Sequence, residues 1–156
     1  MIPISEDHVL VFGGAIERDQ NSFVTTNDTF LIEKKKLQWI KLTNSGVVPK
    51  NRAAHAMAKI DKFEAIMFGG ALVGGTLARE QLYHLKVKGK EAVWNEINTE
   101  GEKPGRRYGH TLCFNKPNLI LFGGSTGSKN INETWILDLM QKSFRWKKVI
   151  CPGIVP

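Results

Sequence analysis

Arginine and histidine recur in the pattern R-x-x-H, which pairs an anion-binding side chain with one that can transfer protons. Arg52 and His55 form the first copy, and Arg107 and His110 form the second. A histidine can transfer protons near neutral pH, and an arginine can hold a carboxylate or phosphate through its planar fork of donors. Because both residues return at the same phase of a repeat, we expect the histidines to be structural and to begin inner strands.

Metal and nucleotide sites are not indicated elsewhere. No cysteine, histidine or acidic residue lies at metal-ligand spacing from His84, so we predict no metal. The segment GGALVGGT at 69–76 lacks the lysine that a phosphate-binding loop requires, and in GSTGSKN the lysine is out of position. The sequence predicts no cofactor, no catalytic residue and no enzyme activity for this chain.

Composition and charge narrow the class of partner. The chain has 42% hydrophobic and 24% charged residues, with a net charge of +7. Such a surface favours an acidic protein, a phosphorylated segment or nucleic acid, but no nucleic-acid recognition motif is present. The two cysteines, Cys113 and Cys151, are interpreted as free thiols. With no secretory leader and no apolar run long enough for a membrane, we expect an intracellular protein, cytoplasmic or nuclear.

The R-x-x-H pairs belong to a longer sequence repeat. Three apolar runs end in paired glycines: VLVFGG, AIMFGG and LILFGG. The first glycine of each pair stands at position 13, 69 or 123, a period of roughly 55 residues. An aromatic residue and then a tryptophan follow each pair. The repeated residues, which we expect to be structural, are Gly13, Gly14, Phe30, Trp39, Gly69, Gly70, Tyr83, Trp94, Gly123, Gly124, Trp135 and Trp146.

A repeat of this length and content resembles the kelch repeat, which forms one four-stranded blade of a β-propeller. We therefore predict an all-β fold, a partial kelch-type β-propeller with three four-stranded antiparallel blades. The predicted domain spans 1–156, with approximate repeats at 1–48, 49–103 and 104–156. In such blades the double glycines permit positive φ and close backbone approach, and the large aromatic side chains fill the wedge between blades.

Basic residues in the connections are the predicted partner-binding residues. Connections that vary in length between repeats are loops, and such loops often form the binding face. The best candidates for contact loops are 15–26 and 71–78. The cations predicted to meet an acidic or phosphorylated protein partner are Lys50, Arg52, Arg106, Arg107 and Lys129. Arg52 and Arg107 also repeat in phase, which leaves a structural role open for both.

The stretches PGRRYGHTLCFNKPNLILFGG (104–124) and FGGALVGGTLAREQLYHLKV (68–87) resemble the kelch region of the kelch-containing serine/threonine protein phosphatases. The resemblance implies a non-catalytic, regulatory or docking module in phosphorylation signalling. No phosphatase metal-binding motif is present, so no catalytic residue is carried over. The alternative is a freestanding kelch adaptor or scaffold, such as a substrate receptor. A third interpretation, a kelch-type sugar oxidase, would need copper-ligand residues that the sequence lacks.

The first repeat begins inside its first strand, and the chain ends at Pro156, the proline that should open another repeat. A closed propeller has four to eight blades. We expect the chain to be a segment of a larger kelch propeller, completed by further blades of the same protein. The rival expectation is a half-ring that closes by two-fold self-association.

Overall fold

The computed structural model describes residues 1–19 and 22–150, and nearly all regular structure in them is β-strand. Short apolar runs bounded by glycine and polar turns favour strands over helices. The described part has one short 3-10 turn, η1 (Val73–Gly75). Its strands are β1 (Ile2–Pro3), β2 (His8–Asp19), β3 (Ser22–Glu33), β4 (Gln38–Gly46), β5 (Ala56–Asp61), β6 (Glu64–Phe68), β7 (Leu82–Lys88), β8 (Glu91–Ile97), β9 (Thr99–Glu100), β10 (Thr111–Asn115), β11 (Asn118–Phe122), β12 (Thr134–Asp138) and β13 (Phe144–Val149). The all-β prediction is confirmed, whereas Cys151 and Pro156 lie outside the described residues.

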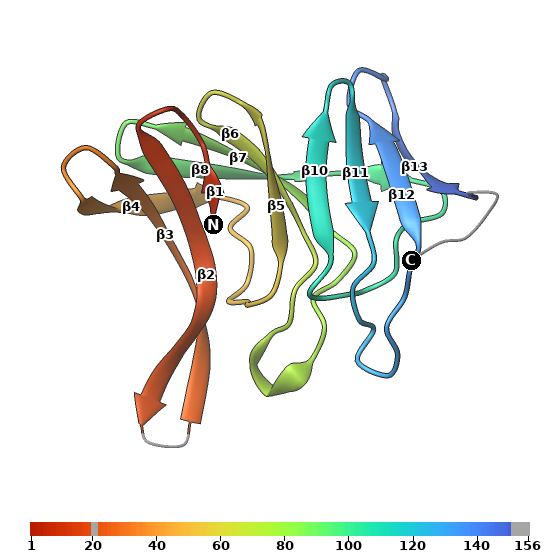
Figure 1. Cartoon of the computed structure of the whole chain (residues 1–156), viewed down its shortest axis with the longest axis horizontal. Helices are drawn as coiled ribbons and strands as arrows, with labels where there is room; N and C mark the ends of the chain where they lie inside the picture. The colour runs from red at the N-terminus through yellow and green to blue at the C-terminus, as the bar shows by residue number, and fades with distance from the viewer. Residues whose placement is uncertain (20–21, 151–156) are drawn as a thin grey trace.

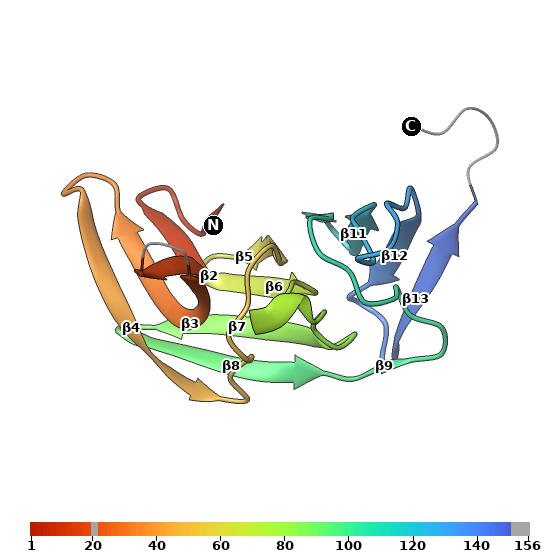
Figure 2. The same ribbon diagram turned by 90° about the horizontal axis from the view of Figure 1, so that it is seen from below.

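Consecutive strands pair antiparallel in three groups of four, which we call the first blade (β1–β4), the second blade (β5–β8) and the third blade (β10–β13). The blades stand side by side in an open arc (Figures 1 and 2). Neighbouring blades are also joined by parallel pairing of their outermost strands. Residues 43–46 of β4 pair with 91–94 of β8, and β9 pairs with the start of β13.

Two hydrophobic clusters fill the spaces between the blades. The first lies between the first and second blades, where Phe12 packs against Trp94 with ring centroids 4.5 Å apart. The second lies between the second and third blades and includes Phe68, Trp135 and Trp146. A strand that is covered on both faces needs a continuous apolar run rather than an alternating one. Residues 65–68 of β6 are therefore buried without interruption.

Phe30 and Trp39 depart from the prediction that the repeated aromatics fill the wedge between blades. The Trp39 side chain is 57% exposed, and its ring meets that of Phe30 edge to face at 5.8 Å. The equivalent Trp94 is fully buried, because the first blade covers it. No described residue of the chain provides a blade beyond the first, on the side where Phe30 and Trp39 lie. The position of these aromatics is therefore set by the repeat, but their burial is not.

The prediction that segment 15–26 is a loop is wrong. The segment continues β2 and β3 into a β-hairpin that projects beyond the blade, with Ile16 opposite Val24 and Glu17 opposite Phe23 (Figure 1). The register shifts between Phe12 and Gly14, and the glycines there have φ of 61° and 113°. Such a bulge lets the strands continue past the glycine pair with an altered twist. Residues 20–21 are outside the described residues.

Candidate partner-binding site

One end of the arc is formed by connections between strands, and we call it the loop face: residues 47–55, 69–81, 101–110 and 123–133. These segments lie together at the bottom of Figure 1. Backbone hydrogen bonds bind them into pairs. Ala53 and Ala71 exchange two such bonds of 2.9 and 2.8 Å, and Tyr108 and Ser125 exchange two of 3.1 and 2.9 Å. The loop face is thus a hydrogen-bonded surface that holds its side chains in defined positions.

The double glycines allow the loop of one blade to pack on the blade before it. The amide of Gly70 donates to the carbonyl of Arg107 at 2.9 Å. A Cβ atom at Gly69, whose φ is 67°, would lie 2.5 Å from that same carbonyl oxygen and 2.6 Å from His110 Cε1. Glycine adopts this backbone conformation without steric cost, and it alone leaves that space free because it has no Cβ atom. The R-x-x-H loop is therefore placed by the glycine pair of the preceding blade.

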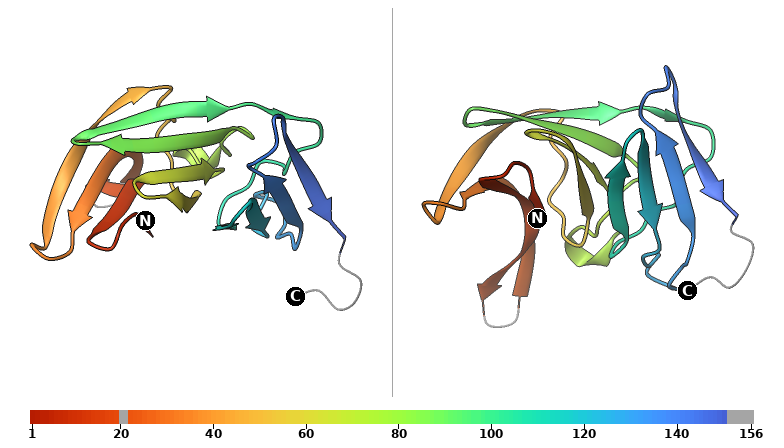
Figure 3. Two further views of the ribbon diagram at one scale, coloured as in Figure 1. Left: turned by 90° about the horizontal axis from the view of Figure 1, so that it is seen from above. Right: turned by 45° about the horizontal axis from the view of Figure 1, so that its top comes forward.

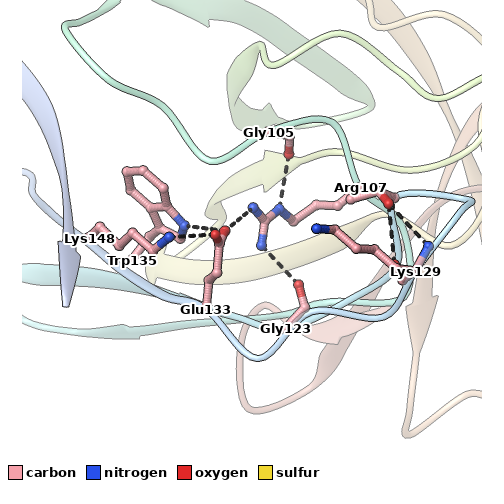
Figure 4. Close-up of polar contacts among 8 residues, drawn as sticks. Gly105, Arg107, Gly123, Lys129, Glu133, Trp135 and Lys148 are labelled. Carbon is pink, nitrogen blue, oxygen red and sulfur yellow. Dashed lines mark hydrogen bonds and ion pairs between the residues drawn. The ribbon is translucent and has the colours of Figure 1, made fainter. Parts of the chain in front are cut away.

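Arg107 is the centre of a closed polar network in the third blade (Figure 4). Its side chain is 1% exposed. Its guanidinium donates from Nε to the carbonyl of Gly105 at 2.9 Å, from Nη1 to the carbonyl of Gly123 at 3.0 Å, and from Nη2 to Glu133 Oε2 at 3.0 Å. Each of the three guanidinium nitrogens donates a hydrogen bond inside the protein. Arg107 therefore has the structural role that its repeated position left open, and its contact with a partner stays a prediction.

Glu133 collects three donors in this network. Lys148 Nζ donates to Oε1 at 2.6 Å, while Trp135 Nε1 and Arg107 Nη2 donate to Oε2 at 3.1 and 3.0 Å. Hydrogen bonds to a carboxylate favour its charged form. The bond from Lys148, followed by those from Trp135 and Arg107, lowers the pKa of Glu133 to about 2. The carboxylate is therefore a permanent negative charge beside Arg107.

Arg52 occupies the equivalent place in the second blade, and it is 3% exposed. It donates from Nε to the carbonyl of Lys50 and from Nη1 to the carbonyl of Gly69, both at 3.0 Å. Its guanidinium carbon lies 5.3 Å from the centroid of the Tyr83 ring. Burial lowers the pKa of Arg52. An arginine remains protonated despite such shifts, so this site carries a buried positive charge.

Arg52 borders a cavity of about 250 Å³ that opens on the loop face. Lys50 and Arg79 line it as well, and its one carboxylate is Glu96. Apolar atoms come from Val48 and Leu72, which also line an adjoining cavity with the exposed Val73. The predicted residues Lys50 and Arg52 thus lie together. Arg79 and Tyr83 join them at this cavity without having been predicted to bind a partner.

The other predicted cations lie apart from this cavity. Arg106 is exposed on the loop between β9 and β10, and its Nε is 3.9 Å from Glu80 Oε1. Lys129 is exposed in the β11–β12 connection, where its amide and carbonyl bond to Thr126 (Figure 4). Both side chains remain on the loop face. The structure therefore distributes Lys50, Arg106 and Lys129 over three connections.

His55 and His110 sit beneath the loop face as neutral rings. Burial, followed by the charge of the neighbouring arginine, lowers the pKa of His55 to about 3 and that of His110 to about 4. Each ring packs edge to face on a phenylalanine, at 5.4 Å from Phe12 for His55 and 5.7 Å from Phe68 for His110. Rings in this environment pack rather than transfer protons, which agrees with the expected structural role.

Metal-binding groups and membrane-spanning helices were considered within residues 1–19 and 22–150. No group of three or more potential metal-binding side chains gathers among them. In the same ranges, no helix has the length and hydrophobicity needed to cross a membrane.

Comparisons with known proteins identify the repeat. Serine/threonine-protein phosphatase BSL2 of Arabidopsis thaliana is 27% identical over 165 residues, covering 95% of this chain and 16% of the relative. Dynein regulatory complex subunit 7 of Chlamydomonas reinhardtii is 31% identical over 108 residues, covering 67% of this chain and 9% of the relative. The chain therefore spans only a small part of the length of these two relatives.

The fold is also found among solved structures. The structure of YjhT superposes on this chain with a TM-score of 0.74 at 16% identity, covering 96% of this chain and 51% of that one. The KLHDC2/KLHL20/DRC7 Kelch-repeats domain matches residues 2–156. The predicted kelch-type architecture is thereby confirmed, and this chain belongs to the family of KLHDC2/KLHL20/DRC7 Kelch-repeats domains.

Proposed function

We propose that this chain is a protein-interaction module that binds an acidic or phosphorylated protein partner through its loop face and catalyses no reaction itself. The observation that carries this proposal is the exposure of Lys50 and Arg106 on a face whose backbone is held by cross-loop hydrogen bonds. A preordered surface loses little conformational freedom on binding, so more of the contact energy becomes affinity. Exposed cations at its rim speed association with an acidic surface.

A charge-reversal experiment tests the loop face. The double variant Lys50→Glu with Arg106→Glu should weaken partner capture at least tenfold, because two attractive cations become repulsive. The control is Lys88→Glu with Lys142→Glu, two exposed positions at the opposite ends of the strands, since it changes the net charge equally. Capture can be measured by surface plasmon resonance with the partner recovered by crosslinking. Equal affinity of the two double variants would show that binding does not use this face.

We further propose that the module is the kelch region of a serine/threonine protein phosphatase. The similarity to BSL2 over 95% of the chain supports this assignment. An antibody against residues 1–156 should detect a band well above 17.5 kDa in native lysate. Its immunoprecipitate should carry metal-dependent phosphatase activity.

The alternative is a freestanding kelch adaptor, and similarity to a relative named as a dynein regulatory complex subunit supports it. In that case the same immunoprecipitate would lack phosphatase activity. A band near 17.5 kDa would also exclude the tethered phosphatase. A freestanding chain would then need self-association, rather than further blades of the same protein, to cover Trp39.

A further inference from the structure

The second and third blades contain the same buried arginine in different electrostatic surroundings. Arg52 and Arg107 use Nε and Nη1 in the same way, on backbone carbonyls of the same two positions in the repeat. Arg107 also holds the carboxylate of Glu133, two residues before Trp135. The residue two positions before the equivalent Tyr83 is Gln81. The second blade therefore has a neutral amide where the third has a charged partner for its arginine.

Gln81 is engaged elsewhere and does not replace that partner. Its Oε1 accepts a bond from the Tyr83 hydroxyl at 2.9 Å, and its Nε2 donates to Glu96 Oε2 at 3.0 Å. Glu96 stands where the third blade has Lys148, because each lies opposite the aromatic of the neighbouring strand. Within the described part of the chain, no carboxylate oxygen comes within 4.0 Å of the Arg52 guanidinium.

A buried cation without a carboxylate is a costly arrangement unless a ligand completes it. Arg52 is only 3% exposed, yet it lines an open cavity. Lys50 and Arg79 line this cavity too, so three cations face one carboxylate, Glu96. The surroundings favour a small anion that can accept several hydrogen bonds, as Glu133 does in the third blade.

We propose that the cavity beside Arg52 binds the side-chain carboxylate of an aspartate or glutamate from a partner peptide, in the role that Glu133 fills for Arg107. This inference rests on the proposed function and names the chemistry of its partner. The planar fork of arginine matches a carboxylate. Val48 and Leu72 extend from this cavity into the adjoining one, so an apolar residue follows or precedes the acidic one.

The test uses the full chain and the labelled peptide acetyl-Ala-Leu-Asp-Leu-Ala-amide, followed by fluorescence anisotropy. The Asp peptide should bind at least tenfold more tightly than the same peptide with Asn. Gln81→Glu should weaken binding at least tenfold, because the new carboxylate competes for Arg52 and, beside Glu96, repels the aspartate of the peptide. Gln38→Glu, an exposed position at the start of β4, is the charge-matched control and should leave binding unchanged. Unchanged binding of the Asp peptide to Gln81→Glu would overturn the proposal.

Two further peptides separate other sources of anion. One carries a free C-terminal carboxylate and no acidic side chain, and the other carries phosphoserine in place of aspartate. Tighter binding of either one than of the Asp peptide would overturn the assignment. If the Lys50→Glu, Arg106→Glu variant fails to capture the natural partner while Gln81→Glu still captures it, the loop face functions and only the carboxylate site is refuted. If neither variant changes capture of the natural partner, the proposed function itself is refuted.

Discussion

Lowering the pH from 7 to 5 should destabilise the chain by about 4 kcal/mol through His55 and His110. Their pKa values are lowered to about 3 and about 4, so both rings stay neutral in the folded state at pH 5. In the unfolded chain the ordinary value is 6.5, and both rings take up a proton. The unfolded state thus binds more protons, and stability falls as the pH drops below 6.5. At pH 5 the difference is about 1.5 pKa units, or about 2 kcal/mol for each histidine.

Urea unfolding followed by tryptophan fluorescence at pH 7, 6 and 5 measures this loss. Ordinary carboxylates titrate near pH 4 and contribute little above pH 5. Replacing His110 with Gln should therefore remove about half of the pH dependence. As a control, a chain with the solvent-exposed Gln141 replaced should lose as much stability between pH 7 and pH 5 as the unaltered chain. If stability is the same at pH 7 and 5, or if His110→Gln leaves the slope unchanged, the histidines are not buried as neutral rings.

Three further outcomes follow from packing and from the polar network. Trp94→Ala should cost about 3–5 kcal/mol of unfolding free energy, whereas Trp39→Ala should cost under about 1 kcal/mol, because only Trp94 is enclosed; equal losses in urea titrations would contradict this. Gly69→Ala should lower Tm by several degrees, since its Cβ would collide with the carbonyl of Arg107, and an unchanged Tm would refute the close approach. Glu133→Gln should cost about 2 kcal/mol by weakening the charged bond to Arg107, and calorimetry showing no loss would refute that role.

The spacing of glycines and aromatics was sufficient to predict the strands, because a strand covered on both faces must be apolar throughout and must end at a turn. It could not predict that Trp39 is exposed, since burial depends on a neighbouring blade and not on the residue itself. The hairpin at 15–26 was missed because apolar and polar residues alternate only weakly along it. Its apolar residues Ile16 and Phe23 are exposed, so no buried face imposes a regular pattern. A difference in length between repeats signals an insertion without saying whether it is loop or strand.

The sequence predicted where the candidate cations lie, but not which contacts their side chains make. Lys50, Arg106 and Lys129 were expected on a loop face, and they are found there. A loop position alone does not reveal that Arg107 turns inward, because its partners are carbonyls contributed by other segments. The exchange of Glu133 for Gln81 was visible when the repeats were aligned on Trp135 and Tyr83. Only the structure shows that this exchange changes the charge beside a buried arginine.

The parallel pairing of β4 with β8 has a consequence for how the chain opens. The amide of Val47 donates to the carbonyl of Trp94 at 2.8 Å, so one sheet runs through the first and second blades without a break. Among the described residues, strand pairing between the second and third blades is limited to two residues of β9 beside β13 (Figure 3). In repeat proteins each interface contributes separately to cooperativity. Deuterium should therefore enter the third blade first, while the other two exchange together as a single cooperative unit.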